Sequence, residues 1–375
     1  MKVLIGPKLW TENVSNLRFS KFEEVMIMDV WMLGEKDFLR NALHENNKPR
    51  YIISDQYYEI ADCSYADIVV PSALYFYKIG RRFAKENVFS TNTETRVPFS
   101  FMFNRRKVAR HLCVKLFEYF NLTQYNYSMC FEPIPLEENL VNRLLQESTV
   151  PNKNRLKEFL LATSKIKCQI LADGTSYSSR AEIPPDQLLT STGDDKVFNY
   201  EGITNLTPNL MAPYKIARSV IDSSAVHIIS ETSDFGETTS AYTEKTVFSI
   251  VCNTFPIWAG GWHLVRNFKE MGFDTFDDVI DNSYDLYDSF LDRCYYAVAN
   301  NLEILSDNTH ASRLRNNNMD RLIKNRQHLF SEKSLEHFWK RLEKYNLSEN
   351  ALLYLNMHIN SPHGTKVTSS PMPPG

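Results

Sequence analysis

The chain has 375 residues, 43% of them hydrophobic, which is enough to bury two cores or one large one. This composition excludes collagen-like, intrinsically disordered and disulfide-scaffold proteins. The formal net charge is -3 at pH 7, from 42 Lys and Arg against 45 Asp and Glu, so the chain does not coat nucleic acid through its bulk charge. The overall charge does not exclude a local basic face on the surface of the protein.

The sequence has no pattern typical of disulfide or zinc-binding cysteines, of a secretory signal or of a membrane span. The six cysteines form no CxxC pair, which predicts reduced thiols without disulfides or zinc. The start, MKVLIGPKLW, holds too short an apolar stretch for a secretory signal, and no later run is long enough to span a membrane. We therefore expect a cytoplasmic protein that does not contact a membrane. The Pro-, Ser- and Gly-rich end, 361–375, predicts a flexible tail.

The first ninety residues alternate strand-like and helical patterns. Strand candidates are 2–6, 23–31, 50–54 and 66–71, and helical patterns cover 35–46 and 73–87. Strands that alternate with helices predict a parallel sheet. A polar stretch follows at 90–98, and there we place the boundary between a first domain, 1–92, and a second, 93–355.

The second domain opens with a strand pattern at 97–103 and a helix pattern at 105–120. The signal is weak from 132 to 210, apart from a helix at 154–163. It then sharpens, and the predicted order is helix 214–224, strand 225–230, loop 231–242, helix 243–252, strand 256–261 and helix 263–273, closed by Gly272. This order is typical of a nucleotide-binding doubly wound fold, whose ligands bind at the carboxyl ends of the strands. The rest is helical to about Leu355.

The strongest chemical feature follows the strand at 225–230. The polar residues placed at this edge of the sheet are Glu231, Thr232, Thr243, Glu244 and Lys245. Thr243 is suited to be the N-cap of the next helix, and Lys245 in its first turn would add positive charge to a phosphate site. Glu244 could accept hydrogen bonds from two ribose hydroxyls. The alternative is that Glu244 only complements the helix dipole beside a solvated Lys245.

Two basic groups on helices are further candidates. Arg106 and Arg110 are four residues apart, so both could reach one diphosphate at the amino end of the helix at 105–120. In the first domain, one helical stripe contains Lys78, Arg81, Arg82 and Lys85, which would suit a polyanion such as DNA. For both groups the alternative is a solvated helix face.

Several of these residues together resemble a known family. Asn104, Arg110, Leu116 and Phe117, followed by Glu231–Ser233 and Thr243–Lys245, resemble the donor-domain signature of fucosyltransferase-type glycosyltransferases. The run from Thr243 through PIWAGG and GFDTF to SYD, which ends at Asp285, is similar to glycosyltransferase-like proteins of tailed phages. Ala241 and Thr232 depart from the fucosyltransferase pattern, which has Tyr and Asn at those positions.

The resemblance implies an α/β protein with the GT-B fold, in which two Rossmann-like domains face a central cleft. The second domain would hold the nucleotide sugar, with Arg110 on its diphosphate, Glu244 on its ribose and Lys245 on a phosphate. Glu231 and Thr232 would line the sugar pocket. The co-substrate would be a UDP- or GDP-sugar, with no bound cofactor and no metal, because basic side chains and a helix dipole can offset the charge of the leaving diphosphate.

The acceptor side is less constrained. The catalytic base should lie at a strand end of the first domain, where Asp55 is our candidate, with a turn or helix cap as the alternative. His227 is expected to be an interior histidine rather than a base. The acceptor that we would test first is 5-hydroxymethylated cytosine in double-stranded phage DNA, in the host cytoplasm. The alternatives are a glycan-building transferase and a non-catalytic nucleotide-sugar-binding or structural protein.

Overall fold

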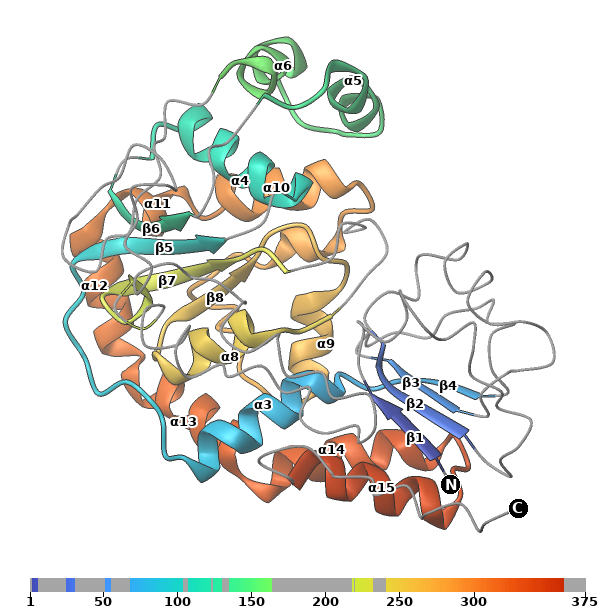
Figure 1. Cartoon of the computed structure of the whole chain (residues 1–375). Helices are drawn as coiled ribbons and strands as arrows, with labels where there is room; N and C mark the ends of the chain where they lie inside the picture. Colours follow the sequence, from blue (N-terminus) through green and yellow to red (C-terminus); the bar gives the residue numbers. More distant parts are fainter. Residues whose placement is uncertain are drawn as a thin grey trace. The chain divides into compact units, whose positions relative to one another are not determined.

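The structure is a computed structural model of the chain. It describes residues 2–5, 25–30, 51–54, 68–103, 107–122, 124–129, 135–163, 218, 220–231 and 241–360. Among these, the residues up to 86 and from 330 onward form one compact unit, and residues 87–329 form a second. Two parallel sheets, one in each unit, make this an α/β protein (Figure 1). None of the helices in these ranges is long and apolar enough to cross a membrane.

The first unit is built on a four-stranded sheet whose strands follow the order of the chain. They are β1 (Lys2–Ile5), β2 (Val25–Val30), β3 (Tyr51–Ser54) and β4 (Ile68–Pro71). Each pairs with the next in parallel, which confirms the parallel sheet predicted from the alternation of patterns.

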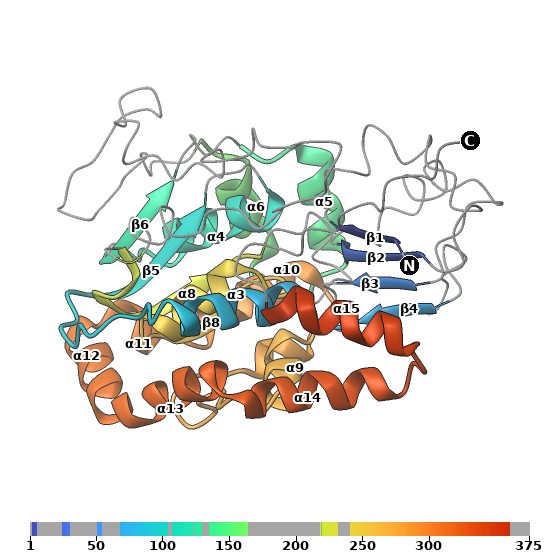
Figure 2. The ribbon, with the colours of Figure 1, turned by 60° about the horizontal axis from the view of Figure 1, so that its bottom comes forward.

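The described helices of the first unit come from two distant parts of the sequence. They are α3 (Leu74–Lys85) from one part, and α14 (Glu332–Glu343) and α15 (Glu349–Asn360) from the other. Helix α3 packs against α15, and the two run side by side in Figure 2. The ring of Tyr77 on α3 meets Phe338 on α14 edge-on, with 5.2 Å between the ring centroids. This packing groups α14 and α15 with the first unit, whereas we had placed residues up to 355 in the second domain.

The second unit contains a four-stranded parallel sheet with a different order. Its strands are β5 (Val97–Phe103), β6 (Tyr125–Met129), β7 (Ser224–Ile229) and β8 (Phe255–Trp258), arranged β6-β5-β7-β8. The strands predicted at 97–103, 225–230 and 256–261 are confirmed as β5, β7 and β8. We did not predict β6, although its alternation of Tyr125, Tyr127 and Met129 with polar residues is a strand pattern.

Helices surround this second sheet. They are α4 (Val108–Tyr119), α5 (Glu138–Gln146), α6 (Lys153–Leu161), α8 (Glu244–Val251), α9 (Leu264–Glu270), the 3-10 helix η5 (Ser283–Leu286), α10 (Phe290–Ala299), α11 (Leu302–Ser306), α12 (Asn308–Asn317) and α13 (Met319–Phe330). Gly272 follows α9 with φ +85°, in the left-handed region that glycine adopts easily, as expected for a residue that closes a helix.

Helices α4 and α8 lie on opposite faces of the second sheet. Phe99 and Phe101 of β5 pack against Phe117 of α4. Side chains alternate along a strand, so Ser100 points to the other face, where it meets His227 of β7. Glu231 is four residues after His227, so its side chain points to the same face as that of His227, and there it accepts a hydrogen bond from Thr246 of α8. The chain therefore changes face between β5 and β7, and this switch point is where doubly wound sheets bind ligands.

The end of the sheet opposite the switch point is held by a buried arginine. Arg315 on α12 donates to the backbone oxygens of Asn253 at 3.0 Å and of Cys252 and Asn92 at 3.2 Å. It also donates to the backbone oxygen of Glu94 at 3.2 Å. Burial lowers the pKa of Arg315, but the ring of backbone oxygens satisfies its guanidinium. The arginine thus joins α12 to the segments that precede β5 and β8.

Candidate functional site

The amino end of α8 lies at the carboxyl end of β7, as the sequence predicted. Strand β7 ends at Ile229 and α8 begins at Glu244. Thr243 is the N-cap, because its hydroxyl accepts a hydrogen bond from the backbone N–H of Lys245 at 3.4 Å. This confirms Thr243 as the start of the helix and places Glu244 and Lys245 in its first turn.

Glu231 joins the end of β7 to this helix start. Its Oε1 accepts hydrogen bonds from the backbone N–H of Thr243 at 3.1 Å and from the hydroxyl of Thr246 at 2.7 Å. Its Oε2 accepts a bond from the hydroxyl of Thr243. Burial raises the pKa of Glu231, although Lys245 and the two threonines act in the opposite direction. Glu231 is therefore held against the helix, and it positions the first turn of α8.

Lys245 and Glu244 form the charged part of the site. The ammonium group of Lys245 donates to Glu244 Oε1 at 3.0 Å and to the hydroxyl of Thr243 at 3.2 Å, and it lies 4.0 Å from Glu231 Oε2. Burial acts to raise the pKa of Glu244, but the charge and hydrogen bond of Lys245, a backbone N–H and, least, the charge of Arg110 together hold that pKa below its usual range. Glu244 is thus an ionised carboxylate at neutral pH.

Arg110 connects the two features that the sequence placed at strand-to-helix junctions. It lies in the first turn of α4, 1% exposed, and its charge acts on Glu244 at the start of α8. Helices α4 and α8 cover opposite faces of the sheet (Figure 1), and Arg110 and Glu244 lie in their first turns, which follow β5 and β7 on the two sides of the switch point. Of the other predicted residues, Arg106, Thr232 and Asp55 lie outside the described residues.

His227 is an interior histidine, as expected. Its Nδ1 lies 3.0 Å from the hydroxyl of Ser100, which in turn accepts a bond from Ser224 at 2.8 Å. Burial lowers the pKa of His227 to about 3, and the charge of Lys245 acts in the same direction. A neutral, buried imidazole with a serine partner stabilises the sheet and offers no proton to a substrate.

The basic residues of the predicted stripe on α3 do not form one exposed face. Lys78 is buried. Arg81 pairs with Glu332 and donates to the backbone oxygen of Phe330 at 3.4 Å. Arg82 pairs with Glu86 at 3.0 Å. Of the four basic residues, Lys85 is the exposed one. Contacts within the first unit thus use most of the charge that we had assigned to a polyanion.

A network that the sequence did not reveal connects α8 with the next loop. Thr246 accepts a hydrogen bond from the indole N–H of Trp258 at 2.9 Å, at the end of β8. The backbone N–H of Trp258 donates to the hydroxyl of Tyr284 at 3.1 Å. Tyr242, next to the N-cap, donates to the backbone oxygen of Leu264 at the start of α9. No short sequence pattern indicates these hydrogen bonds, because the two partners of each bond come from different elements.

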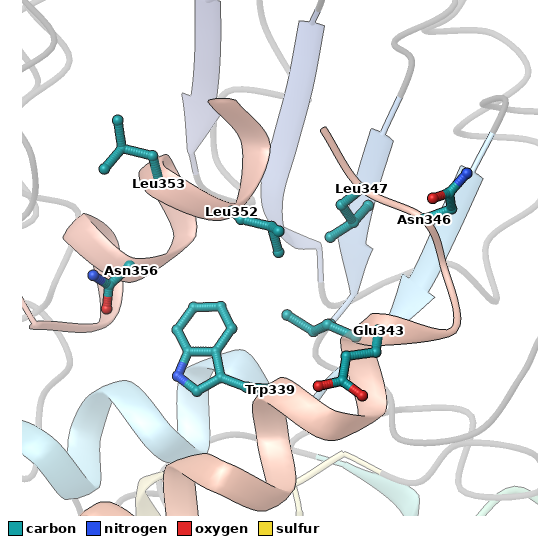
Figure 3. A pocket seen from close by; sticks show the side chains of 8 residues that line it. Trp339, Glu343, Asn346, Leu347, Leu352, Leu353 and Asn356 are labelled. Carbon is teal, nitrogen blue, oxygen red and sulfur yellow. The ribbon is translucent and has the colours of Figure 1, made fainter. Parts of the chain in front are cut away.

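Two hollows in the described part of the chain differ from this cluster in their lining. One, of about 670 Å³, lies in the first unit, where Trp339, Leu347 and Leu352 face it (Figure 3). Its lining is mostly apolar with a single carboxylate, Glu343, so it brings no reactive groups together. The other, of about 680 Å³, lies beside η5 in the second unit and is lined by several aspartates.

Metal-ligating groups do not cluster within the described ranges. There, no set of three His, Cys, Asp or Glu side chains has the geometry to hold a metal ion. Asp277 is bonded to Lys269 at 2.8 Å and Asp278 to Arg321 at 2.8 Å, so cations of the chain already pair with both. The described cysteines, Cys113, Cys252 and Cys294, are buried free thiols.

Fold and site together define an α/β protein with a charged cluster at the switch point of a doubly wound sheet. Comparison of the chain with protein-family models, with curated proteins and with solved structures found no match. The geometry of the cluster is therefore the basis for assigning a function.

Proposed function

We propose that this protein is a glycosyltransferase that binds a nucleoside diphosphate sugar in its second unit and moves the sugar to a hydroxyl acceptor. The observation that carries the proposal is the placement of Arg110 at the start of α4 and of Glu244 and Lys245 at the start of α8, at the switch point between β5 and β7, with the charge of Arg110 acting on Glu244. Doubly wound sheets bind nucleotides at this position because helix amino ends converge there.

The charges of the cluster suit two parts of such a donor, its diphosphate and its ribose. Arg110 and Lys245, with the amino end of α8, supply positive charge for a diphosphate. The same charges would stabilise the diphosphate as it leaves, which is the main electrostatic demand of glycosyl transfer without a metal. Glu244 is ionised and partly exposed, and its carboxylate can accept hydrogen bonds from the ribose hydroxyls.

Further support comes from the two sheets and from the sequence resemblance. Each unit has its own parallel sheet, as the GT-B fold of two Rossmann-like domains requires. The TEKT motif that resembles glycosyltransferases is the motif that caps α8 and supplies Glu244 and Lys245. GT-B is accordingly the arrangement that we propose, with Asp55 as the proposed base.

A hydroxymethylated cytosine in double-stranded DNA stays the first acceptor to test, but the packed residues Lys78, Arg81 and Arg82 lend it no support. A transferase that builds a glycan fits the same donor cluster. A non-catalytic nucleotide-sugar-binding protein would bind the donor without turnover.

Release of nucleoside diphosphate tests the proposal. UDP- and GDP-sugars are incubated with the protein, with and without hydroxymethylcytosine DNA, beside Lys245→Ala and the control Lys324→Ala. Lys324 is an exposed lysine on α13, away from the cluster. We expect release from one donor that Lys245→Ala abolishes and Lys324→Ala preserves. Release only with DNA would identify the acceptor, whereas binding without release would favour the non-catalytic alternative. No binding of any donor would refute the proposal.

A further inference from the structure

The loop between β8 and α9 lies beside the charged cluster, at the same edge of the second sheet. Strands β7 and β8 are parallel neighbours, and just beyond β8 the backbone N–H of Ala259 donates to the oxygen of Ile229 at 2.8 Å. The hydroxyl of Tyr242, which directly precedes the N-cap of α8, donates to the backbone oxygen of Leu264 at the start of α9. The loop, residues 259–263, is therefore held next to the first turn of α8.

Close packing fixes the course of this loop. Gly260 has φ +99°, and a Cβ atom there would lie 2.6 Å from Cε2 of Phe290, so the position requires glycine. Its backbone oxygen accepts a hydrogen bond from Nε of the buried Arg293 at 3.1 Å. At the other end of the loop, His263 has φ +52° and is the N-cap residue of α9. A loop that is held by such contacts needs little reorganisation to receive a ligand.

Two aromatic side chains end the loop. The rings of Trp262 and His263 are stacked, with 4.7 Å between their centroids and 27° between their planes. Both residues are partly exposed. The indole nitrogen of Trp262 and Nδ1 of His263 are nevertheless buried. What the indole presents to a ligand is therefore the flat carbon surface of its ring rather than its N–H.

The composition of the loop determines which chemical group fits it. Residues 259–263 are Ala, Gly, Gly, Trp and His, with no carboxylate, lysine or arginine among them. A phosphate is bound by cations and by converging N–H groups, which the start of α8 supplies and this loop does not. A flat aromatic ligand needs an aromatic ring to stack on, and a nucleobase stacks on an indole because every base has a π-face.

The order of the strands determines the order in which the parts of a bound donor lie. The sheet order β6-β5-β7-β8 places Arg110 after β5, Glu244 and Lys245 after β7, and Trp262 after β8 (Figure 1). In a nucleoside diphosphate sugar the ribose joins the diphosphate to the base. With the diphosphate at Arg110 and Lys245 and the ribose at Glu244, the base extends to the side of β8, where the loop with Trp262 lies.

We propose that the β8–α9 loop binds the nucleobase of the donor, which stacks on the ring of Trp262. This inference rests on the proposed function, and it adds the part of the site that recognises the nucleoside. The diphosphate and the base then bind to different strand ends of one sheet. Stacking tolerates any base, so Trp262 strengthens the binding of UDP and GDP alike.

Calorimetry with ligands that have or lack a base tests the inference. The affinities of UDP, GDP and inorganic pyrophosphate are measured for the wild type, Trp262→Ala and Trp262→Phe. We expect Trp262→Ala to lower the affinity for UDP and GDP about tenfold, which is about 1.4 kcal/mol, and to change the affinity for pyrophosphate less than about twofold. Trp262→Phe keeps an aromatic ring and should retain most of the affinity. Trp339→Ala is the matched control, because it removes a partly exposed tryptophan of α14 in the first unit.

Fluorescence provides a second measurement that needs no alanine variant. A base stacked on Trp262 should quench its emission, so UDP should quench the wild type and Trp339→Phe but much less the variant Trp262→Phe. Unchanged quenching in Trp262→Phe would overturn the inference and leave the proposed function intact. Unchanged UDP and GDP affinities in Trp262→Ala, or equal losses for these ligands and pyrophosphate, would do the same. A wild type that binds none of the three ligands would overturn both.

Discussion

Arg110 on α4 and Glu244 on α8 lie on opposite sides of the second sheet's switch point, and the charge of the arginine helps to keep the glutamate ionised. The two residues belong to helices that follow different strands, β5 and β7. Neither helix start would make a strong site alone. Together they supply positive charge, an ionised carboxylate and the amino ends of two helices at the switch point of the sheet.

The positive charge of the cluster should determine donor affinity. We expect Lys245→Ala to weaken binding of the nucleoside diphosphate by about 1.5 to 3 kcal/mol, the usual worth of a charged hydrogen bond. Arg110→Gln should have an effect of similar size. Calorimetry measures both, with the exposed Lys324→Ala as the control and thermal unfolding as the check on folding. Unchanged diphosphate affinity in both variants would refute the assignment of the phosphate site.

Glu231 should matter chiefly for stability. Glu231→Ala leaves the N–H of Thr243 and the hydroxyl of Thr246 without their acceptor in a buried setting, so the free energy of unfolding should fall by about 2 to 4 kcal/mol. Glu231→Gln keeps one acceptor oxygen and should cost less. Urea denaturation compares the two. If alanine is tolerated as well as glutamine, Glu231 does not hold the first turn of α8.

His227 should make stability depend on pH. Its pKa is about 3 in the folded protein against an ordinary value of 6.5, so below pH 6.5 the unfolded chain binds a proton that the folded protein does not. Stability therefore falls as pH falls from 6.5 towards 3, by up to ~1.4 kcal/mol per pH unit from this group. His227→Gln should flatten the curve between pH 6.5 and 5, where most carboxylates stay ionised. Urea midpoints in that range measure it, and parallel curves for the two proteins would contradict the prediction.

Arg315 should be essential to the second unit. Its guanidinium donates to backbone oxygens on both sides of the sheet end, including those of Asn253 and Glu94. Arg315→Met removes these bonds and leaves buried carbonyl groups unpaired, at a cost of about 3 to 5 kcal/mol. Arg313→Met on the same helix is the control, because Arg313 is exposed. Thermal unfolding of both variants should show a large shift for the first and almost none for the second.

Local patterns were sufficient for most elements of the second unit. The apolar run at 97–103, the strand at 225–230 and the helix start at Thr243 were all predicted correctly. These features depend on neighbours within a few residues: side-chain alternation, a capping threonine, a glycine that ends a helix. His227 was also assigned correctly to the interior, because it begins an apolar run.

Contacts between distant segments were not predictable in the same way. Lys78, Arg81 and Arg82 have the spacing of an exposed basic stripe, yet α14 and its neighbours bury or pair them. The missed strand β6 is the one that gives the sheet its order and hence its switch point. Helical periodicity shows that a face exists, but it does not show what covers that face.

The sequence by itself determined that this chain is an α/β protein, that a strand ends near Ser230, and that Thr243 begins a helix with Glu244 and Lys245 in its first turn. Only the tertiary structure decided that the charge of Arg110 acts on Glu244, that Glu231 is bonded to α8, and that Asp285 and Asn282 line a hollow beside η5. The reason is physical. Backbone preferences act over a few residues, whereas strand order, burial and the pairing of charges depend on which distant segments pack together.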